Sequence, residues 1–175
     1  MQATLDLDQV IFVPAGRPPH KNPAQVTSAL DRLAMLRLAV GDNPSFAVDT
    51  LELGREGKSF TADTLATFKE REPGADLWFI IGGDSLADLH TWRRPGTIVS
   101  LARLAVARRP GWDVDLDRVN YLLPQTTGRI DVVDTPLIDI ASHEIRTRAS
   151  RSQPIRYLIP EAVREYIDRN GLYFR

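Results

Sequence analysis

The chain has 175 residues, of which 43% are hydrophobic and 26% are charged, a composition typical of one globular domain. Its 22 Lys and Arg residues against 23 Asp and Glu argue against a binder of nucleic-acid polymers or anionic membranes, which needs a basic excess. The absence of cysteine excludes disulfides, thiolate metal sites and cysteine nucleophiles. No apolar run approaches the roughly 20 residues of a membrane span, and residues 1–6 lack the pattern of an export signal, so we expect a cytoplasmic protein.

Apolar runs and helical spacings alternate along the chain. Short apolar runs bounded by glycine or proline predict buried strands, and apolar residues three or four positions apart predict helices. The first half predicts strands at residues 10–13 and 46–48, a helix opened by Thr27 or Ser28 with Leu30, Leu33, Ala34 and Leu38 on one face, and a helix at 61–70. The second half predicts strands at residues 77–81, 104–107 and 130–133. It also predicts a helix at residues 85–90, a second that begins near Pro95 and a third that has Ser142 as its N-cap. A fourth helix has Pro160 at its first position and stops at Asn170.

This alternation predicts an α/β fold, a Rossmann-like, doubly wound and mostly parallel sheet. We expect residues 1–175 to form a single domain whose C-terminal helical segment spans about residues 142–171. Ligands bind beyond the carboxyl ends of the strands in such sheets, so the loops that follow strands are the candidate sites.

Gly82, Gly83 and Asp84 follow the most apolar predicted strand. Glycines there let a ligand approach the backbone, and the carboxylate of Asp84 can accept hydrogen bonds from ribose hydroxyls. A tight turn in which Asp84 caps the next helix explains the same residues. Trp92, which lies after the next short helix, fits either a ring that stacks on a flat ligand or a half-buried packing residue.

Two further segments suggest anion binding. Arg146, Arg148 and Arg151 lie near the start of the helix from Ser142, where the helix dipole disfavours cations unless an anion binds there; the alternatives are solvation or pairing with Glu144. His20 and Lys21 end a basic loop after the first predicted strand, and both can contact phosphate or simply face water. The exposed amides near Thr61 can also bind an anion.

Other chemistries lack their motifs. Residues 54–59 place only two residues between the glycines, whereas a phosphate-binding Walker loop needs four. His20, His90 and His143 show no metal-ligand spacing, and the HExxH and GxSxG patterns are absent, so we expect no protein-built metal site and no α/β-hydrolase.

Five segments together, in order, resemble the bacterial nicotinate-nucleotide adenylyltransferases of the HxGH nucleotidyltransferase superfamily. They read VPAGRPPHK, GKSFTADTL, FIIGGDSLADLHTW, ASHEIR and IRYLIPEAVREYIDRNGLYF, and the resemblance runs from about Asp6 to the C-terminus. It implies adenylyl transfer from MgATP to nicotinate mononucleotide, which gives deamido-NAD and pyrophosphate. It also implies direct attack on the α-phosphorus, with no covalent enzyme intermediate.

The resemblance also assigns roles to residues. Gly82 and Asp84 would contact the nucleotide ribose, while Ser142, Ile145 and Arg146 would bind the ATP phosphates. Trp92 would stack on the nicotinate ring, amides near Thr61 would receive its carboxylate, and His20 and Lys21 would lie near the mononucleotide phosphate. Asp63 would shape the loop. Mg²⁺ would arrive with ATP, and formation of a homo-oligomer is left open.

The sequence departs from the family pattern in two places. The family motif ISSTxIR has Ser and Thr where this chain has Ala141 and His143, so two hydroxyl donors are lost. No segment matches the family's opening strand and GGTFDPxHxGH loop, so we expect the first strand and first helix to be truncated and leave the catalytic residues unknown. We expect a misplaced start codon or a shortened chain, and the upstream DNA in frame tests this.

Two alternatives stay open. One is a non-catalytic homologue that binds nucleotide and truly lacks the histidine loop. The other is an adenylyltransferase of the same superfamily that acts on a different phosphorylated acceptor.

Overall fold

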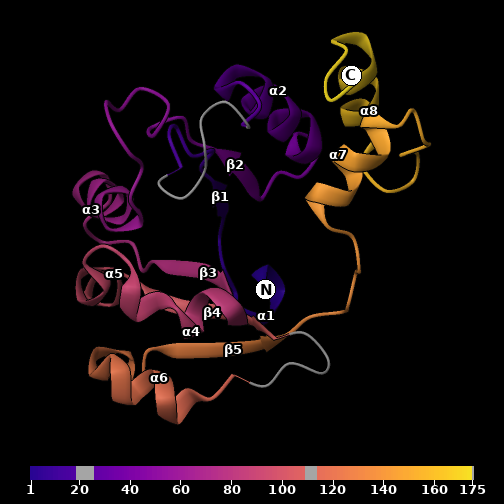
Figure 1. Cartoon of the computed structure of the whole chain (residues 1–175). Coiled ribbons are helices and arrows are strands. Elements are labelled where there is room, and N and C mark those ends of the chain that lie inside the picture. Colours follow the sequence, from indigo (N-terminus) through magenta and orange to yellow (C-terminus); the bar gives the residue numbers. More distant parts are fainter. Residues whose placement is uncertain (19–25, 109–113, 175) are drawn as a thin grey trace. The chain divides into compact units, whose positions relative to one another are not determined.

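A computed structural model describes residues 1–18, 26–108 and 114–174. The chain forms two compact units, each made from segments that are distant in the sequence. The first unit comprises Met1–Leu7, Arg17–Pro19 and Arg55–Leu137, and the second comprises Asp8–Gly16, His20–Gly54 and Ile138–Arg175. Figure 1 locates the elements of both units.

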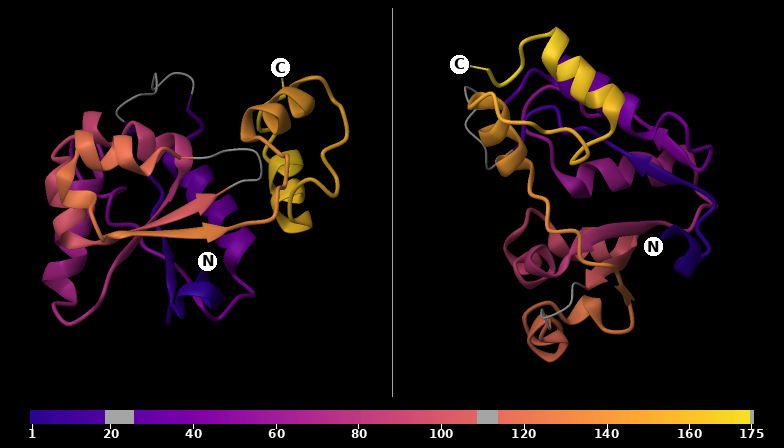
Figure 2. Two further views of the ribbon diagram at one scale, coloured as in Figure 1. Left: turned by 90° about the horizontal axis from the view of Figure 1, so that it is seen from below. Right: turned by 90° about the vertical axis from the view of Figure 1, so that its right-hand side faces the viewer.

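The first unit is built on a parallel sheet of three strands in the order β3 (Trp78–Gly82), β4 (Arg103–Arg108) and β5 (Ile130–Asp134). Figure 2 shows β4 and β5 running side by side in the same direction. The register aligns Phe79 with Leu104 and Ile130, and Ile81 with Val106. Since alternate residues share a face, these apolar side chains form one continuous surface.

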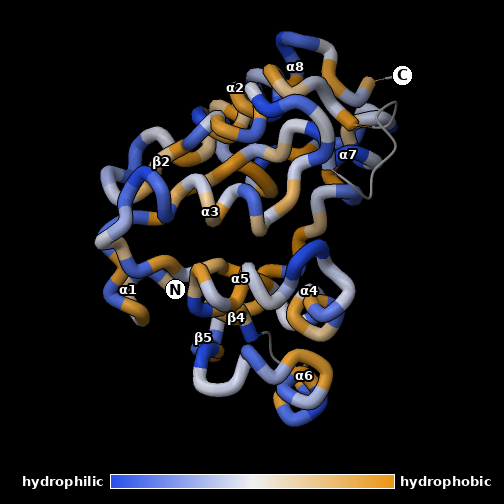
Figure 3. The backbone as a smooth tube through the Cα atoms, turned by 90° about the vertical axis from the view of Figure 1, so that its left-hand side faces the viewer, coloured by the Kyte–Doolittle hydropathy of each residue, from blue (hydrophilic) through white to orange (hydrophobic). Residues whose placement is uncertain are grey.

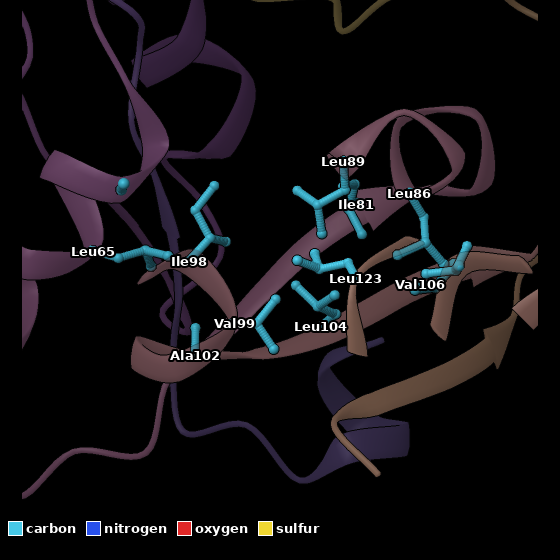
Figure 4. Packing of buried hydrophobic residues seen from close by; sticks show 12 residues of the cluster. Leu65, Ile81, Leu86, Leu89, Ile98, Val99, Ala102, Leu104, Val106 and Leu123 are labelled. Carbon is cyan, nitrogen blue, oxygen red and sulfur yellow. The ribbon is translucent and has the colours of Figure 1, made fainter. Parts of the chain in front are cut away.

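Helices cover that apolar surface. They are α3 (Thr61–Arg71), α4 (Gly83–Ala87), α5 (Pro95–Leu101) and α6 (Leu116–Leu122), with the short 3-10 helices η2 (Leu89–Thr91) and η3 (Pro124–Thr126) between them; α1 (Gln2–Leu5) belongs to the same unit. Leu86, Leu89, Ile98, Leu104 and Val106 are each at most 1% exposed (Figure 4). Burying each such side chain contributes about 1.5–3 kcal/mol to the free energy of unfolding, so this core is the main source of the unit's stability. Hydrophilic and hydrophobic residues alternate along α6, as expected for a helix with one buried face (Figure 3).

The second unit combines a two-stranded parallel sheet, β1 (Val10–Phe12) with β2 (Phe46–Val48), and three helices. The helices are α2 (Ala29–Val40), α7 (Ser142–Ser150) and α8 (Glu161–Arg169). Buried side chains of α7 and α8 pack against Met35 of α2, and α8 lies beside α2 (Figure 2). The Tyr166 hydroxyl donates to a carboxylate oxygen of Asp31 at 2.8 Å. The pKa of Asp31 is lowered chiefly by the hydrogen bond from Ser28, and the bond from Tyr166 lowers it further.

The ends of two helices follow from local sequence. Ser28 caps α2, because its hydroxyl oxygen accepts the amide of Asp31 at 3.0 Å. At the C-terminal end of α8, Gly171 adopts a positive φ of 60°. The amide of Gly171 donates to the carbonyl of Asp168, and the amide of Leu172 donates to the carbonyl of Ile167 at 3.0 Å. This is a Schellman motif, and the left-handed residue explains the glycine.

The α/β prediction with parallel strands is confirmed, and all five predicted strands occur within a residue or two of the expected positions. The strands form two separate sheets rather than one, and α6 was not predicted. The predicted starts of α7 and α8 are each wrong by one residue. The N-cap of α7 is Ala141 rather than Ser142, and Pro160 is the N-cap of α8 rather than its first helical residue. The expected apolar face of α2 is only partly covered, since Leu30 is 77% exposed.

A polar cluster joins β3, β4 and β5 near the amino ends of these strands. Asp131 accepts two hydrogen bonds from Arg103, at 2.8 and 2.7 Å, and one from the Trp78 indole at 2.9 Å. Both side chains of the ion pair are only partly exposed, at 36% and 27%. The hydrogen bonds from Arg103 lower the pKa of Asp131 most, burial opposes them, and the hydrogen bond from Trp78 adds a smaller lowering. This cluster therefore stabilises the amino ends of the three strands, away from the carboxyl ends where the sequence predicts ligand binding.

We expect Asp131→Asn to lower the free energy of unfolding by about 1–2 kcal/mol, because it removes a charge that receives three hydrogen bonds. A lowered carboxylate pKa gives stability that is complete above the unfolded-state pKa, about 3.9, and is lost as the pH falls through the folded-state pKa. The difference from the wild type should therefore shrink below about pH 4 in urea titrations. Asp134→Asn is the matched control: it removes a similar but exposed pair with Arg108 and should cost less.

Candidate functional site

The start of α3 presents backbone amides. Phe60 is the N-cap and no side chain caps this end, while Thr61 is the first helical residue. Within the described residues, the amides of Thr61 and Ala62 make no hydrogen bond, whereas those of Asp63 and Thr64 donate to the carbonyl of Phe60. Ala62 is fully buried, so of these two amides only that of Thr61, which is partly exposed, is available for a carboxylate.

The loop that follows β1 is tied to this helix start. The Ser59 amide donates to the carbonyl of Arg17 at 3.0 Å, and the Arg17 amide donates to the Ser59 hydroxyl oxygen at 3.3 Å. Two segments 42 residues apart are thereby joined. His20 and Lys21, the predicted phosphate contacts of this loop, lie outside the described residues.

Trp92 is half-buried in the first unit. Its ring meets Phe79 of β3 edge-on, with 6.0 Å between centroids, and it packs against the core under α5. Its amide donates to the carbonyl of Leu89 at 3.0 Å, which holds the backbone where η2 ends. The packing interpretation is confirmed, and the half-buried position leaves part of the indole open to a ligand.

The two residues after Trp92 contact the first turn of α3. The guanidinium of Arg93 lies over the Phe60 ring, 4.4 Å from its centroid, and Arg94 forms an ion pair with Asp63. The sequence did not predict either contact, although it placed Asp63 in the loop-shaping role. The indole and the free amides of α3 are therefore connected through neighbouring residues.

Gly82 and Asp84 lie at the carboxyl end of β3, in the same unit as Thr61 and Trp92. The backbone of Gly82, with φ −79° and ψ 159°, is open to any residue, and a Cβ there would meet nothing closer than Asp84 at 3.7 Å. The fold therefore does not require glycine at this position. Asp84 is exposed in the first turn of α4 and makes no capping hydrogen bond, so its carboxylate can accept from a ligand.

The start of α7 in the second unit differs from its prediction. Ala141 is the N-cap, no side chain caps the helix, and Ser142 is its exposed first residue. Ile145 is buried in the core of this unit, so only its backbone can meet a ligand. Arg146 is exposed in the second turn, beyond the strongest field of the helix dipole, and it forms no ion pair within the described residues. The cationic conflict expected there is therefore weaker than the sequence suggested.

The neighbouring arginine is otherwise engaged. The Nε of Arg148 donates to the carbonyl of Pro154 at 3.0 Å, and this bond holds the turn between α7 and α8. Among residues 1–18, 26–108 and 114–174, no group of three or more His, Asp or Glu side chains is arranged to hold a metal ion. The same part of the chain contains no helix with the length and apolarity needed to cross a membrane.

Comparisons with known proteins agree with this architecture. The Cytidylyltransferase-like family model matches residues 1–148. A probable nicotinate-nucleotide adenylyltransferase of Thermomicrobium roseum is 43% identical over 173 residues, which cover 99% of this chain and 81% of the relative. The protein of the same name from Desulfitobacterium hafniense is 42% identical over 169 residues, covering 95% and 82%.

A solved structure shares the fold. It is the Plasmodium falciparum nicotinic acid mononucleotide adenylyltransferase complexed with NaAD, with a TM-score of 0.76 at 19% identity over 95% of this chain and 82% of that chain. The parallel strands, the loops at their carboxyl ends and the family model define a nucleotidyltransferase of the cytidylyltransferase-like class. Within that class, the chain belongs to the nicotinate-nucleotide adenylyltransferase family.

The uncapped start of α7 leads to a stability prediction. Ala141→Ser supplies the missing hydroxyl acceptor and should raise the free energy of unfolding by about 0.5–1 kcal/mol in urea titrations. Ser142→Ala is the control, because a residue at the first helical position does not cap and should change stability little. A loss of stability in Ala141→Ser would contradict the placement of the N-cap.

Proposed function

We propose that this chain transfers the adenylyl group of ATP to nicotinate mononucleotide, which gives deamido-NAD and pyrophosphate in NAD biosynthesis. The observation that carries the proposal is 43% identity across 99% of the chain to a relative of that name. A cytoplasmic location and use of the free mononucleotide, with no nucleic-acid polymer or membrane partner, belong to the same proposal.

The first unit supplies the site for the nicotinate group. Trp92 stacks on the pyridinium ring, and the amide of Thr61 at the start of α3 receives the carboxylate. The support is that the two residues after Trp92 contact the start of α3, through Arg93 over Phe60 and Arg94 with Asp63. His20 and Lys21, which lie outside the described residues, are assigned to the mononucleotide phosphate by the family resemblance alone.

We assign ATP contacts to each unit separately. Asp84 accepts hydrogen bonds from the ribose hydroxyls, and Gly82 leaves space for the nucleotide. The amides at the start of α7 and the side chains of Ser142 and Arg146 bind phosphate oxygens, with Ile145 contributing through its backbone. The guanidinium of Arg146 is exposed and forms no ion pair with any of the described residues, which supports this role.

Catalysis then depends on alignment. A phosphate oxygen of the mononucleotide attacks the α-phosphorus of ATP as pyrophosphate leaves, and cations and N–H donors stabilise the charge that develops. Mg²⁺ would arrive with the substrate as MgATP, bound chiefly by the phosphates of ATP and by water.

Formation of deamido-NAD and pyrophosphate from MgATP and nicotinate mononucleotide is measured by chromatography for the 175-residue chain and for a version extended upstream in frame. Turnover only in the extended version supports an adenylyltransferase whose histidine loop is missing from this chain. Nucleotide binding without turnover in either version supports the non-catalytic homologue. Turnover with another phosphorylated acceptor, and none with nicotinate mononucleotide, supports the other adenylyltransferase.

Trp92→Ala should weaken the binding of nicotinate mononucleotide by about tenfold, because a desolvated ring–cation stack contributes about 1–2 kcal/mol. Binding of ATP should change less than twofold, which separates loss of stacking from general damage. Tyr121→Ala, on an 84% exposed aromatic of α6, is the control and should leave both affinities unchanged. Equal losses for the two nucleotides in Trp92→Ala would exclude the stacking role.

A further inference from the structure

Arg94 connects three elements of the first unit. Its carbonyl accepts the amides of Thr97 and Ile98 at 3.1 and 3.2 Å, which starts α5, and its guanidinium pairs with Asp63 in the first turn of α3. Two residues earlier, the amide of Trp92 is held at the end of η2. The short segment from Trp92 to Arg94 is therefore fixed at both ends.

The backbone of Arg94 is unusual. It lies in the left-handed region, with φ 53° and ψ 57°, although it is not glycine and precedes Pro95. This region is unfavourable for side chains with a Cβ, and a following proline favours extended backbone instead. Such a conformation persists only where neighbouring contacts hold it, and the ion pair to Asp63 is the side-chain contact of Arg94 that the structure shows.

Folding stability does not account for this arrangement. The side chains of Arg94 and Asp63 are 48% and 35% exposed, and ion pairs that are open to water stabilise proteins little. Arg93 adds a second contact between the same two segments, with its guanidinium over Phe60. Both contacts join the residues that follow the indole to the first turn of α3, which carries the Thr61 amide.

We propose that Asp63 and Arg94 are a positioning pair for the pyridine mononucleotide. The pair acts through Trp92: it holds the left-handed turn after the indole, and so sets the position of the ring relative to the start of α3. Neither side chain of the pair needs to touch the ligand. This inference rests on the proposed function, since it assumes that the ring and the carboxylate are bound by these two elements.

The test measures the dissociation constant of nicotinate mononucleotide by titration calorimetry, together with KM for each substrate. Arg94→Gly is the decisive variant, because glycine accepts the left-handed backbone, so the whole side chain and its ion pair are removed without adding backbone strain. It should weaken mononucleotide binding about three- to fivefold, the range expected for loss of one exposed ion pair, and leave the KM for ATP within twofold. Arg94→Lys keeps the charge and should recover most of the affinity.

A double-mutant cycle identifies the pair as the cause. Asp63→Ala should weaken mononucleotide binding as Arg94→Gly does, and the double variant should be no worse than either single one. Arg71→Gln is the matched control, since Arg71 lies over Phe68 at the other end of α3 and should leave both substrates unaffected.

Three results would overturn the inference: unchanged mononucleotide affinity in Arg94→Gly, additive losses in the double variant, or equal losses for ATP and mononucleotide. A wild-type chain that binds the mononucleotide without turnover counts against the proposed function alone, because the affinities still test the pair. A wild-type chain that binds no mononucleotide excludes both.

Discussion

Parallel pairing of β3, β4 and β5 is the constraint on which the first unit depends. The register puts Phe79, Leu104 and Ile130 on one face, and covering that face fixes α4 and α5 against the sheet. Because the strands are parallel, their carboxyl ends lie at one edge, where Gly82 ends β3 and α4 begins. The Trp78–Asp131–Arg103 cluster lies near the opposite ends of the strands, so these stabilising residues and the proposed ligand-binding residues are separated along the same strands.

The regular elements could be predicted because their signals are local. The run at 77–81 and the glycines after it specify β3 and its end, and Asn170 with Gly171 specifies the stop of α8. Helix α6 escaped prediction because its few apolar residues give a weak pattern over seven positions. The N-cap at Ala141 was missed because propensity favours Ser142, whereas the backbone places the cap one residue earlier.

The candidate site was likewise predicted only where its signals are local. Trp92, Thr61 and Gly82 could be proposed from their positions relative to predicted elements, but their connections could not. Asp63 and Arg94 are 31 residues apart, and their pairing requires the packing of α3 against α5, which no local pattern encodes. Arg146 shows the opposite error: a charge near a helix start suggested strong electrostatic conflict, and the observed turn places it where that field has weakened.

The discontinuous second unit has a consequence for the order in which the chain folds during synthesis. Its core joins Met35 to residues between Ile145 and Tyr173. The Thr27 hydroxyl donates to the Tyr173 hydroxyl at 3.0 Å, 146 residues away. These contacts cannot form until the C-terminus has left the ribosome, whereas most of the first unit comes from the continuous stretch Arg55–Leu137. The apolar residues of α2 therefore stay exposed until the C-terminal helices have been synthesised.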